Sequence, residues 1–371
     1  MNKGRLKSVW GGQWGSEGKG QVAKLLTNTM YQGTAVRVGG PNAGHSFYPN
    51  GPENTPEVVQ VLPVASVYRP NLWDAVIGAA GVIDLQYLSR ELMMCAERTN
   101  RFPNLMIDRF ASIITEEDVE KEAHLRGAIA STGKGVGAAT AAKVMRMPKV
   151  VASHEENTNR LNVHAALMQS RATGDLRLRI MDTVYHLNQE LMAGGNVMIE
   201  GTQGYGLSLH TGGYYPFCTS RECTPQALLS QTGVNPNRAE EVESIMVLRT
   251  FPIRVGGNSG PLPNEIDWDT LKEETEGYVW VPERTTVTKT IRRIARFDYG
   301  LPGRAVMQCS PDALALTFLD YRFPYIAGCK PIHFTNEIHA YLYNLGKNLR
   351  TPVRYVSTGP GHTYEYRGAS L

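Results

Sequence analysis

The chain has 371 residues, of which 42% are hydrophobic and 20% charged, and its formal net charge is +3. This length and apolar content allow either one large α/β domain or two or three smaller ones. The near-neutral, mixed charge argues against a nucleic-acid or membrane-surface protein, and no apolar run is long enough to span a membrane. A missing N-terminal signal segment and five scattered cysteines without a C-x-x-C pair predict a reducing cytoplasm with free thiols: Cys95, Cys218, Cys223, Cys309 and Cys329.

Residues 9–21, Val-Trp-Gly-Gly-Gln-Trp-Gly-Ser-Glu-Gly-Lys-Gly-Gln, predict a short strand, a glycine-rich turn and the start of a helix. In such a turn backbone N–H groups converge on an anion, and the helix N-terminus adds partial positive charge. Lys19 is expected to reach the phosphates as a mobile cation. A standard P-loop has a glycine and a hydroxyl residue where this chain has Gln13 and Gly20. The segment alone therefore leaves open a phosphate-binding loop or an ordinary glycine-rich turn.

A second polar loop follows a strand predicted at residues 34–40. Its sequence, Pro-Asn-Ala-Gly-His-Ser at residues 41–46, is sufficient for a tight surface turn. Alternatively, this loop faces the first one across a phosphate site. A lone histidine is more often structural than catalytic, so His45 does not by itself decide between the two interpretations.

The middle of the chain alternates predicted strands and helices. A strand is expected at residues 75–81, a helix at 85–98, and another helix after Thr115, where acidic residues occupy the first turn. Residues 131–137, Ser-Thr-Gly-Lys-Gly-Val-Gly, contain too many glycines for a helix interior and suit close approach to a ligand. A buried strand followed by a turn is predicted at residues 196–204.

Together these segments resemble the motifs of the adenylosuccinate synthetases, which join aspartate to a 6-oxopurine nucleotide while cleaving a nucleoside triphosphate. The first loop matches Gly-Gln-Trp-Gly-x-Glu-Gly-Lys-Gly and the second matches Gly-Gly-x-Asn-Ala-Gly-His-Thr. Further matches occur in family order at residues 131–137, 200–204, 215–220, 254–257, 283–298, 316–320 and 356–360. The resemblance implies an α/β, P-loop-like fold with a largely parallel central sheet flanked by helices. It also implies a single domain over residues 1–371 and a homodimer.

The resemblance also implies a set of site residues. The catalytic residues would be Ser16, Lys19, His45 and Gln203. Nucleoside triphosphate contacts are expected at Gly15, Ser16, Glu17, Gly18, Lys19, Gly20, Gln21, Gly44, His45, Ser46, Phe318, Asp320, Gly359 and Pro360. Monophosphate contacts are expected at Ser16, Asn42, Ser131, Thr132, Arg146, Gln203, Thr219 and Val255. L-aspartate contacts are expected at Val287, Thr288 and Arg292, and Mg²⁺ ligands at Ser16 and Gly44. Arg146 is expected to reach the partner subunit's site.

Several positions depart from the family pattern. At Ser16 the family has an aspartate that takes the N1 proton of IMP and helps to bind the metal, and a serine hydroxyl is a feeble base. Lys134 and Thr290 each replace an arginine, and lysine cannot reproduce the arginine fork. Phe318 replaces a lysine beside the guanine of GTP, which weakens the guanine signature, whereas Asp320 retains it.

The change at position 16 bears on the substrate. Serine is shorter than aspartate and leaves room beside N1 and C2, and guanine differs from hypoxanthine by an amino group on C2. The chain therefore resembles the viral branch of the family, the 2-aminoadenylosuccinate synthetases, which use dGMP with ATP or dATP and supply 2-aminoadenine for DNA. An ordinary synthetase that uses IMP and GTP is the first alternative, and a non-catalytic nucleotide-binding regulator is the second.

Overall fold

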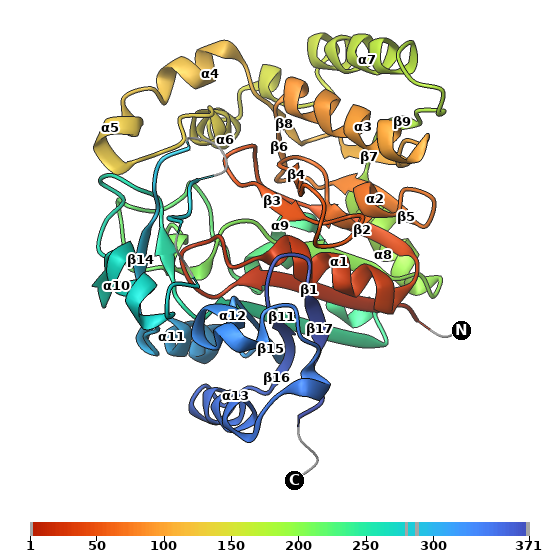
Figure 1. The fold of residues 1–371 in the computed structure, drawn as a ribbon. Helices are drawn as coiled ribbons and strands as arrows, with labels where there is room; N and C mark the ends of the chain where they lie inside the picture. Colours follow the sequence, from red (N-terminus) through yellow and green to blue (C-terminus); the bar gives the residue numbers. More distant parts are fainter. Residues whose placement is uncertain (1–2, 279–280, 286–288, 369–371) are drawn as a thin grey trace.

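The computed structural model describes residues 3–278, 281–285 and 289–368, and Figure 1 shows their arrangement around a central sheet. The sheet has ten strands in the order β17-β16-β15-β11-β1-β10-β2-β5-β7-β9. Neighbouring strands are parallel, except that β17 pairs antiparallel with β16. Their bounds are β1 Arg5–Gly11, β2 Gly33–Arg37, β5 Trp73–Ile77, β7 Leu105–Asp108, β9 Leu178–Met181, β10 Val197–Glu200, β11 Glu241–Arg249, β15 Ala313–Thr317, β16 Val353–Ser357 and β17 Thr363–Glu365.

Helices and short strands fill the connections. The α-helices are α1 Lys19–Met30, α2 Val64–Tyr68, α3 Leu85–Thr99, α4 Glu116–Lys121, α5 Leu125–Ile129, α6 Val136–Val144, α7 Glu155–Gln169, α8 Thr183–Met192, α9 Pro225–Thr232, α10 Trp268–Glu274, α11 Gly300–Cys309, α12 Leu319–Arg322 and α13 Asn336–Asn348. Small sheets join β3 His45–Phe47 with β4 Glu57–Val59, β6 Val82–Ile83 with β8 Ser112–Ile113, and β14 Arg293–Ala295 with β12 Ile253–Arg254 and β13 Glu265–Ile266. Single 3-10 turns lie at Pro148–Val150, Tyr205–Leu207, Pro236–Arg238, Pro324–Ile326 and Pro331–His333. In the part of the chain that the structure describes, no helix combines the length and apolarity needed to cross a membrane.

Helices cover both faces of the sheet. Successive side chains of a strand point to opposite faces, so a strand that is apolar throughout packs against helices on both sides. On β1, Val9 packs in one cluster with Val22 and Leu26 of α1. Its neighbour Trp10 packs in the other cluster, which includes Leu187 of α8. The architecture therefore has a helical layer on each side of the sheet, as an α/β fold with a largely parallel sheet predicts.

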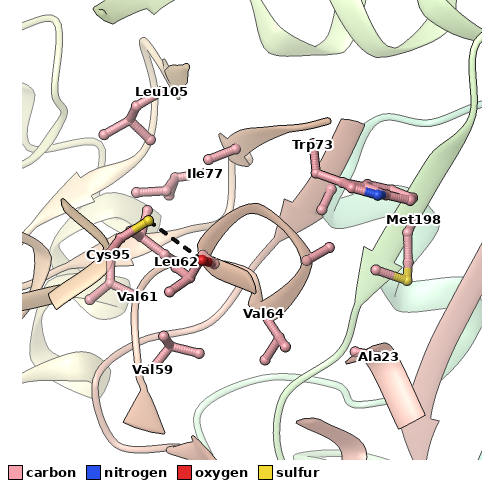
Figure 2. Close-up of a cluster of buried hydrophobic side chains, with 14 of the residues drawn as sticks. Ala23, Val59, Val61, Leu62, Val64, Trp73, Ile77, Cys95, Leu105 and Met198 are labelled. Atoms are coloured by element: carbon pink, nitrogen blue, oxygen red, sulfur yellow. Dashed lines mark hydrogen bonds between the residues drawn. The ribbon is translucent and has the colours of Figure 1, made fainter. Parts of the chain in front are cut away.

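Figure 2 shows part of the first cluster, where Ala23 of α1, Trp73 of β5 and Met198 of β10 approach one another. Burial of each large apolar side chain contributes about 1.5–3 kcal/mol to stability. Cys95 of α3 belongs to the same cluster and donates its S–H to the carbonyl of Val67 at 3.4 Å. All five cysteines are free thiols, which confirms the prediction from the sequence.

The sequence located these elements well but misplaced some ends. The helix predicted at residues 85–98 is α3, and Thr115 caps α4 in a capping box with Asp118. The strands predicted at residues 34–40 and 75–81 instead end at Arg37 and Ile77. Glycines that follow each strand belong to the loops, so both strands end earlier than predicted.

The carboxyl ends of parallel strands lie at one edge of the sheet, where α/β proteins place their ligands. β1, β2, β10, β11 and β15 end there with Gly11, Arg37, Glu200, Arg249 and Thr317. The loops that follow carry the motifs found in the sequence. The fold thus brings together segments that are more than 300 residues apart.

Candidate active site

The first glycine-rich loop is folded around a buried carboxylate. Gly15, Ser16 and Gly18 have φ angles of 89°, 59° and 82°, so the loop turns through left-handed backbone. Glu17 is fully buried, and its Oε1 accepts backbone N–H groups from Gln13 at 3.2 Å and from Gly15 at 2.8 Å. Glu17 therefore holds the shape of the loop.

Lys19, the first residue of α1, is anchored rather than mobile. Its Nζ lies 2.6 Å from Oε2 of Glu17, and both side chains are almost completely buried. In the turn after β10, a Cβ on residue 204 would lie 2.4 Å from Oε1 of Glu17, so this position must be glycine. The prediction of a mobile cation is wrong for this structure, because burial with Glu17 holds the ammonium beside the loop.

The second loop places His45 against two charged residues at strand ends. Its Nδ1 lies 2.6 Å from Oε1 of Glu200, and the same oxygen accepts from Nη1 of Arg37 at 3.1 Å. Burial, together with the Arg37 cation, lowers the pKa of His45 to about 4. Its Nε2 is buried and has no hydrogen-bond partner among the described residues. His45 is therefore neutral near pH 7, with one ring nitrogen available for a ligand.

Arg37 and Glu200 were missed by the sequence analysis. Arg37 also donates from Nη2 to the carbonyl of Ala43 at 2.7 Å, which ties the second loop to β2. Glu200 accepts the N–H of Val64 at 2.8 Å. A charged residue at the end of an otherwise apolar strand was the available signal, but only the strand order reveals that the two are partners.

Two arginines converge on Ser16. Nη1 of Arg292 donates to Ser16 Oγ, and Nη1 of Arg249 donates to the Ser16 carbonyl at 3.3 Å. Glu283 binds Arg249 at 2.6 Å and lies 3.9 Å from Arg292. Arg249 and Glu283 were also absent from the predicted site. The serine hydroxyl thus lies beside the arginine that the sequence assigned to aspartate binding.

The segment after β15 turns directly into a short helix. The strand ends at Thr317, Phe318 has a φ of 56°, and Asp320 lies in α12. The guanidinium carbon of Arg249 lies 3.7 Å from the centroid of the Phe318 ring. One face of that ring is therefore already covered by a cation.

The N-terminus of α6 is occupied by the protein's own carboxylate. Glu122 accepts N–H groups from Gly135 at 2.7 Å and from Ala138 at 3.0 Å. These groups are therefore not free for a phosphate in this conformation. The hydroxyl groups of Thr132 and Thr219, on loops that face the same cavity, remain as the predicted phosphate donors.

These loops enclose a cavity of about 1180 Å³. The predicted site residues that line it are Gly15, Ser16, Gly18, Lys19, Gly20, Asn42, Gly44, His45, Ser46, Ser131, Thr132, Gln203, Thr219, Val255, Arg292 and Phe318. Others lie outside its lining: Glu17, Gln21, Arg146, Asp320, Gly359 and Pro360. Val287 and Thr288 fall outside the described residues. The predicted residues of the different motifs therefore surround one shared cavity, and six of the predicted contacts lie outside its lining.

The family model for adenylosuccinate synthetase matches residues 8–329, a span that includes the loops described above up to α12. The chain belongs to the adenylosuccinate synthetase family. Like its synthetase relatives, it is a carbon–nitrogen ligase.

Relatives of this synthetase include viral and cellular proteins. An N6-succino-2-amino-2'-deoxyadenylate synthase of Vibrio phage phiVC8 is 32% identical over 94% of this chain and 94% of its own length. An adenylosuccinate synthetase of Methanococcus aeolicus is 32% identical over 95% of this chain and 96% of its own. Sequence identity alone therefore does not separate the two activities.

Solved structures show the same fold. Cyanophage S-2L succinoaminodeoxyadenylate synthetase, bound to dGMP and dATP as an energy donor, superposes with a TM-score of 0.78 at 27% identity and covers 98% of this chain and 96% of its own. The fully ligated adenylosuccinate synthetase of Plasmodium falciparum gives 0.80 at 20% identity, covering 98% of this chain and all of its own. The predicted fold class is confirmed.

The donors for a metal ion in this synthetase are few. The described residues contain no group of three His, Cys, Asp or Glu side chains that could hold an ion. Ser16 and Gly44, the predicted ligands, both line the cavity and offer one hydroxyl and one carbonyl oxygen. Mg²⁺ takes oxygen ligands and completes its shell with substrate phosphate oxygens and water, so this hydroxyl and carbonyl would fit as its protein ligands although neither is the carboxylate that Mg²⁺ usually has.

Proposed function

We propose that this synthetase joins L-aspartate to C6 of dGMP with cleavage of ATP or dATP, and so forms N6-succino-2-amino-2'-deoxyadenylate for 2-aminoadenine in DNA. The observation that carries the proposal is Ser16, a small side chain that lines the cavity where the family has an aspartate. The phage relative, named for this product, and the cyanophage structure with dGMP and dATP support the assignment.

The cavity offers separate places for the three substrates. The triphosphate lies along the first loop, where backbone N–H groups at the start of α1 favour an anion. The 5'-phosphate of dGMP lies near Thr132 and Thr219, with the purine between Gln203 and Ser16. The carboxylates of aspartate lie near Arg292, whose guanidinium can hold a carboxylate with two parallel hydrogen bonds.

The first step transfers the γ-phosphoryl group to O6 of the purine, which turns a poor leaving group into a good one. Mg²⁺ held by Ser16, Gly44 and the triphosphate would offset negative charge on the phosphates. His45 binds the transferring group through Nε2. Approach of the anionic phosphoryl raises the pKa of the imidazole, which takes a proton from solvent at Nε2, and Glu200 stabilises the imidazolium that results. Nε2 therefore becomes a hydrogen-bond donor only when substrate is bound.

In the second step the amine of aspartate attacks C6 and inorganic phosphate leaves. N1 of the purine loses its proton to solvent water when O6 is phosphorylated in the first step, because the family's aspartate is not present to accept it. Lys19 is already paired with Glu17. The positive charges of Arg292, which donates to Ser16 Oγ, and of Arg249, which donates to the Ser16 carbonyl, favour loss of this proton. Ser16 acts as a small polar contact rather than as a base.

The assembly is part of the same proposal. Residues 1–371 act as one catalytic unit, and two copies form a homodimer in the host cytoplasm. Arg146 lies after the end of α6, exposed and outside the lining of its own cavity. From that position it reaches the 5'-phosphate in the partner's site.

The test is a comparison of monophosphates with the purified protein, aspartate and ATP. Release of phosphate and formation of the succino product with dGMP, but little with IMP or dIMP, is the expected result. Activity with IMP alone would identify an ordinary adenylosuccinate synthetase. The 32% identity to the Methanococcus aeolicus protein is the observation that supports this alternative. Binding of nucleotides without turnover of any of them would leave a non-catalytic regulator.

A further inference from the structure

Asp320 is a buried carboxylate with one free oxygen. It lies in the first turn of α12, two residues after Phe318, which lines the cavity. The residue is 1% exposed, and its Oδ1 has no hydrogen-bond partner among the described residues. Burial raises its pKa to about 6. A buried acceptor without a partner is costly, so this oxygen suits a hydrogen-bond donor supplied by a ligand.

The second oxygen of Asp320 is already in use. The hydroxyl of Tyr278 donates to Oδ2 at 2.9 Å, and the backbone of Gly359 lies against the same oxygen, since a Cβ there would be 3.7 Å away. Tyr278 is held by its own backbone bond to the Thr275 carbonyl at 2.9 Å and by edge contact with Tyr321, with ring centroids 6.5 Å apart. A second donor in the plane of the carboxylate would have to displace this hydroxyl.

Purines differ in how many donors they present to a carboxylate. Guanine presents N1–H and its 2-amino group side by side, which require both oxygens. Adenine presents the N–H of its 6-amino group beside N1, which is an acceptor. A carboxylate with one oxygen available therefore matches adenine and loses half of its pairing with guanine.

We propose that Tyr278 determines the choice of energy donor, because it occupies one oxygen of Asp320 and leaves the other to bind the amino group of adenine. This inference rests on the proposed function, in that the donor base lies beside Phe318 and Asp320. Tyr278 acts through Asp320 and touches no reacting atom, so it is a positioning residue.

Tyr278→Phe removes the hydroxyl and frees Oδ2. The ratio of kcat/KM for ATP to that for GTP is expected to fall roughly tenfold or more, since one charged hydrogen bond to guanine is restored. ITP has N1–H but lacks the 2-amino group, so the variant should gain less with ITP than with GTP. Equal losses with all three donors, or an unchanged ratio, would overturn the proposal.

Tyr355→Phe is the matched control, because Tyr355 also donates from a buried hydroxyl to a carboxylate, Glu243, at 3.2 Å. It should leave the donor ratio unchanged. In the double variant Tyr278→Phe/Asp320→Asn the gain with GTP should disappear, because the pairing requires the carboxylate. A gain that persists in the double variant would contradict the role of Asp320.

Equilibrium binding of ATP and GTP, without dGMP or aspartate, separates this inference from the proposed function. If the parent protein turns over no monophosphate, the proposed function fails, yet the ratio of ATP to GTP affinity still tests Tyr278. If turnover of dGMP is normal and the affinity ratio does not respond to Tyr278→Phe, only the inference on the donor fails. A melting curve for each variant shows whether it is folded.

Discussion

At the scale of single residues, Ser16 combines a backbone requirement with a chemical one. Its φ of 59° lies in the left-handed region, which aspartate and asparagine tolerate better than most residues. Backbone strain therefore does not explain why this chain lacks aspartate there. The explanation lies in the side chain, which lines the cavity and accepts from Arg292.

Ser16→Asp is expected to lower kcat/KM for dGMP by about tenfold to a hundredfold, because the longer side chain fills the space beside C2 and pairs with Arg292. The same variant should gain activity with dIMP. Ser16→Gly is the matched control, since glycine keeps the space and accepts the left-handed φ. It should retain dGMP binding while reacting more slowly. The measurement is initial rate against each monophosphate, and full activity of Ser16→Asp with dGMP would refute the argument from space.

At the scale of elements, helix α3 supports the second loop through one buried carboxylate. Glu91 is fully buried and accepts backbone N–H groups from Gln60 at 2.6 Å and from Leu62 at 2.8 Å. The side chain of Gln60 in turn donates to the carbonyl of Pro41 in the second loop. The helix thus reaches the site through the residues that precede α2.

Glu91 predicts a pH dependence of stability. Burial raises its pKa from 4.5 to about 7, so the folded state disfavours the charged form. The contribution of Glu91 to the free energy of unfolding is fully present below pH 4.5 and is lost as the pH rises through 7. Relative to Glu91→Gln, which stays neutral, the parent should lose up to about 3 kcal/mol between pH 4.5 and 8. Urea unfolding of both proteins across this range measures the difference, and parallel curves would contradict the assignment.

At the scale of the whole molecule, the region around Arg146 points to a second copy of the chain. Val144, Met145 and Met147, which flank it in sequence, are 68%, 74% and 54% exposed. Large apolar side chains gathered on a surface often mark an interface. This supports the proposal that Arg146 belongs to the partner's site.

Mixing two inactive variants tests the shared site. Arg146→Ala removes the crossing residue, and His45→Asn removes a residue that acts within its own subunit. After exchange of subunits, half of the dimers would carry one intact site, so activity should recover to about a quarter of the parent rate. Each variant alone at the same total concentration is the control. No recovery at any ratio, although the subunits exchange, would show that Arg146 does not complete the partner's site.

The sequence by itself predicted a few strands and helices and the loops that form the cavity, and the resemblance of its motifs to a family implied the α/β class. The individual elements follow from short contiguous patterns: apolar runs, capping residues and glycine-rich turns. The residues within those motifs, among them His45 and Thr219, accordingly line the cavity.

Only the tertiary structure decided which charged groups are partners. His45 meets Glu200 because β10 lies between β1 and β2 in the sheet although it follows them by more than 150 residues in the chain. Tyr278 meets Asp320 across 42 residues. Strand order decides which charged groups become partners, and burial together with those partners lowers or raises their pKa values. No local sequence pattern contains this information.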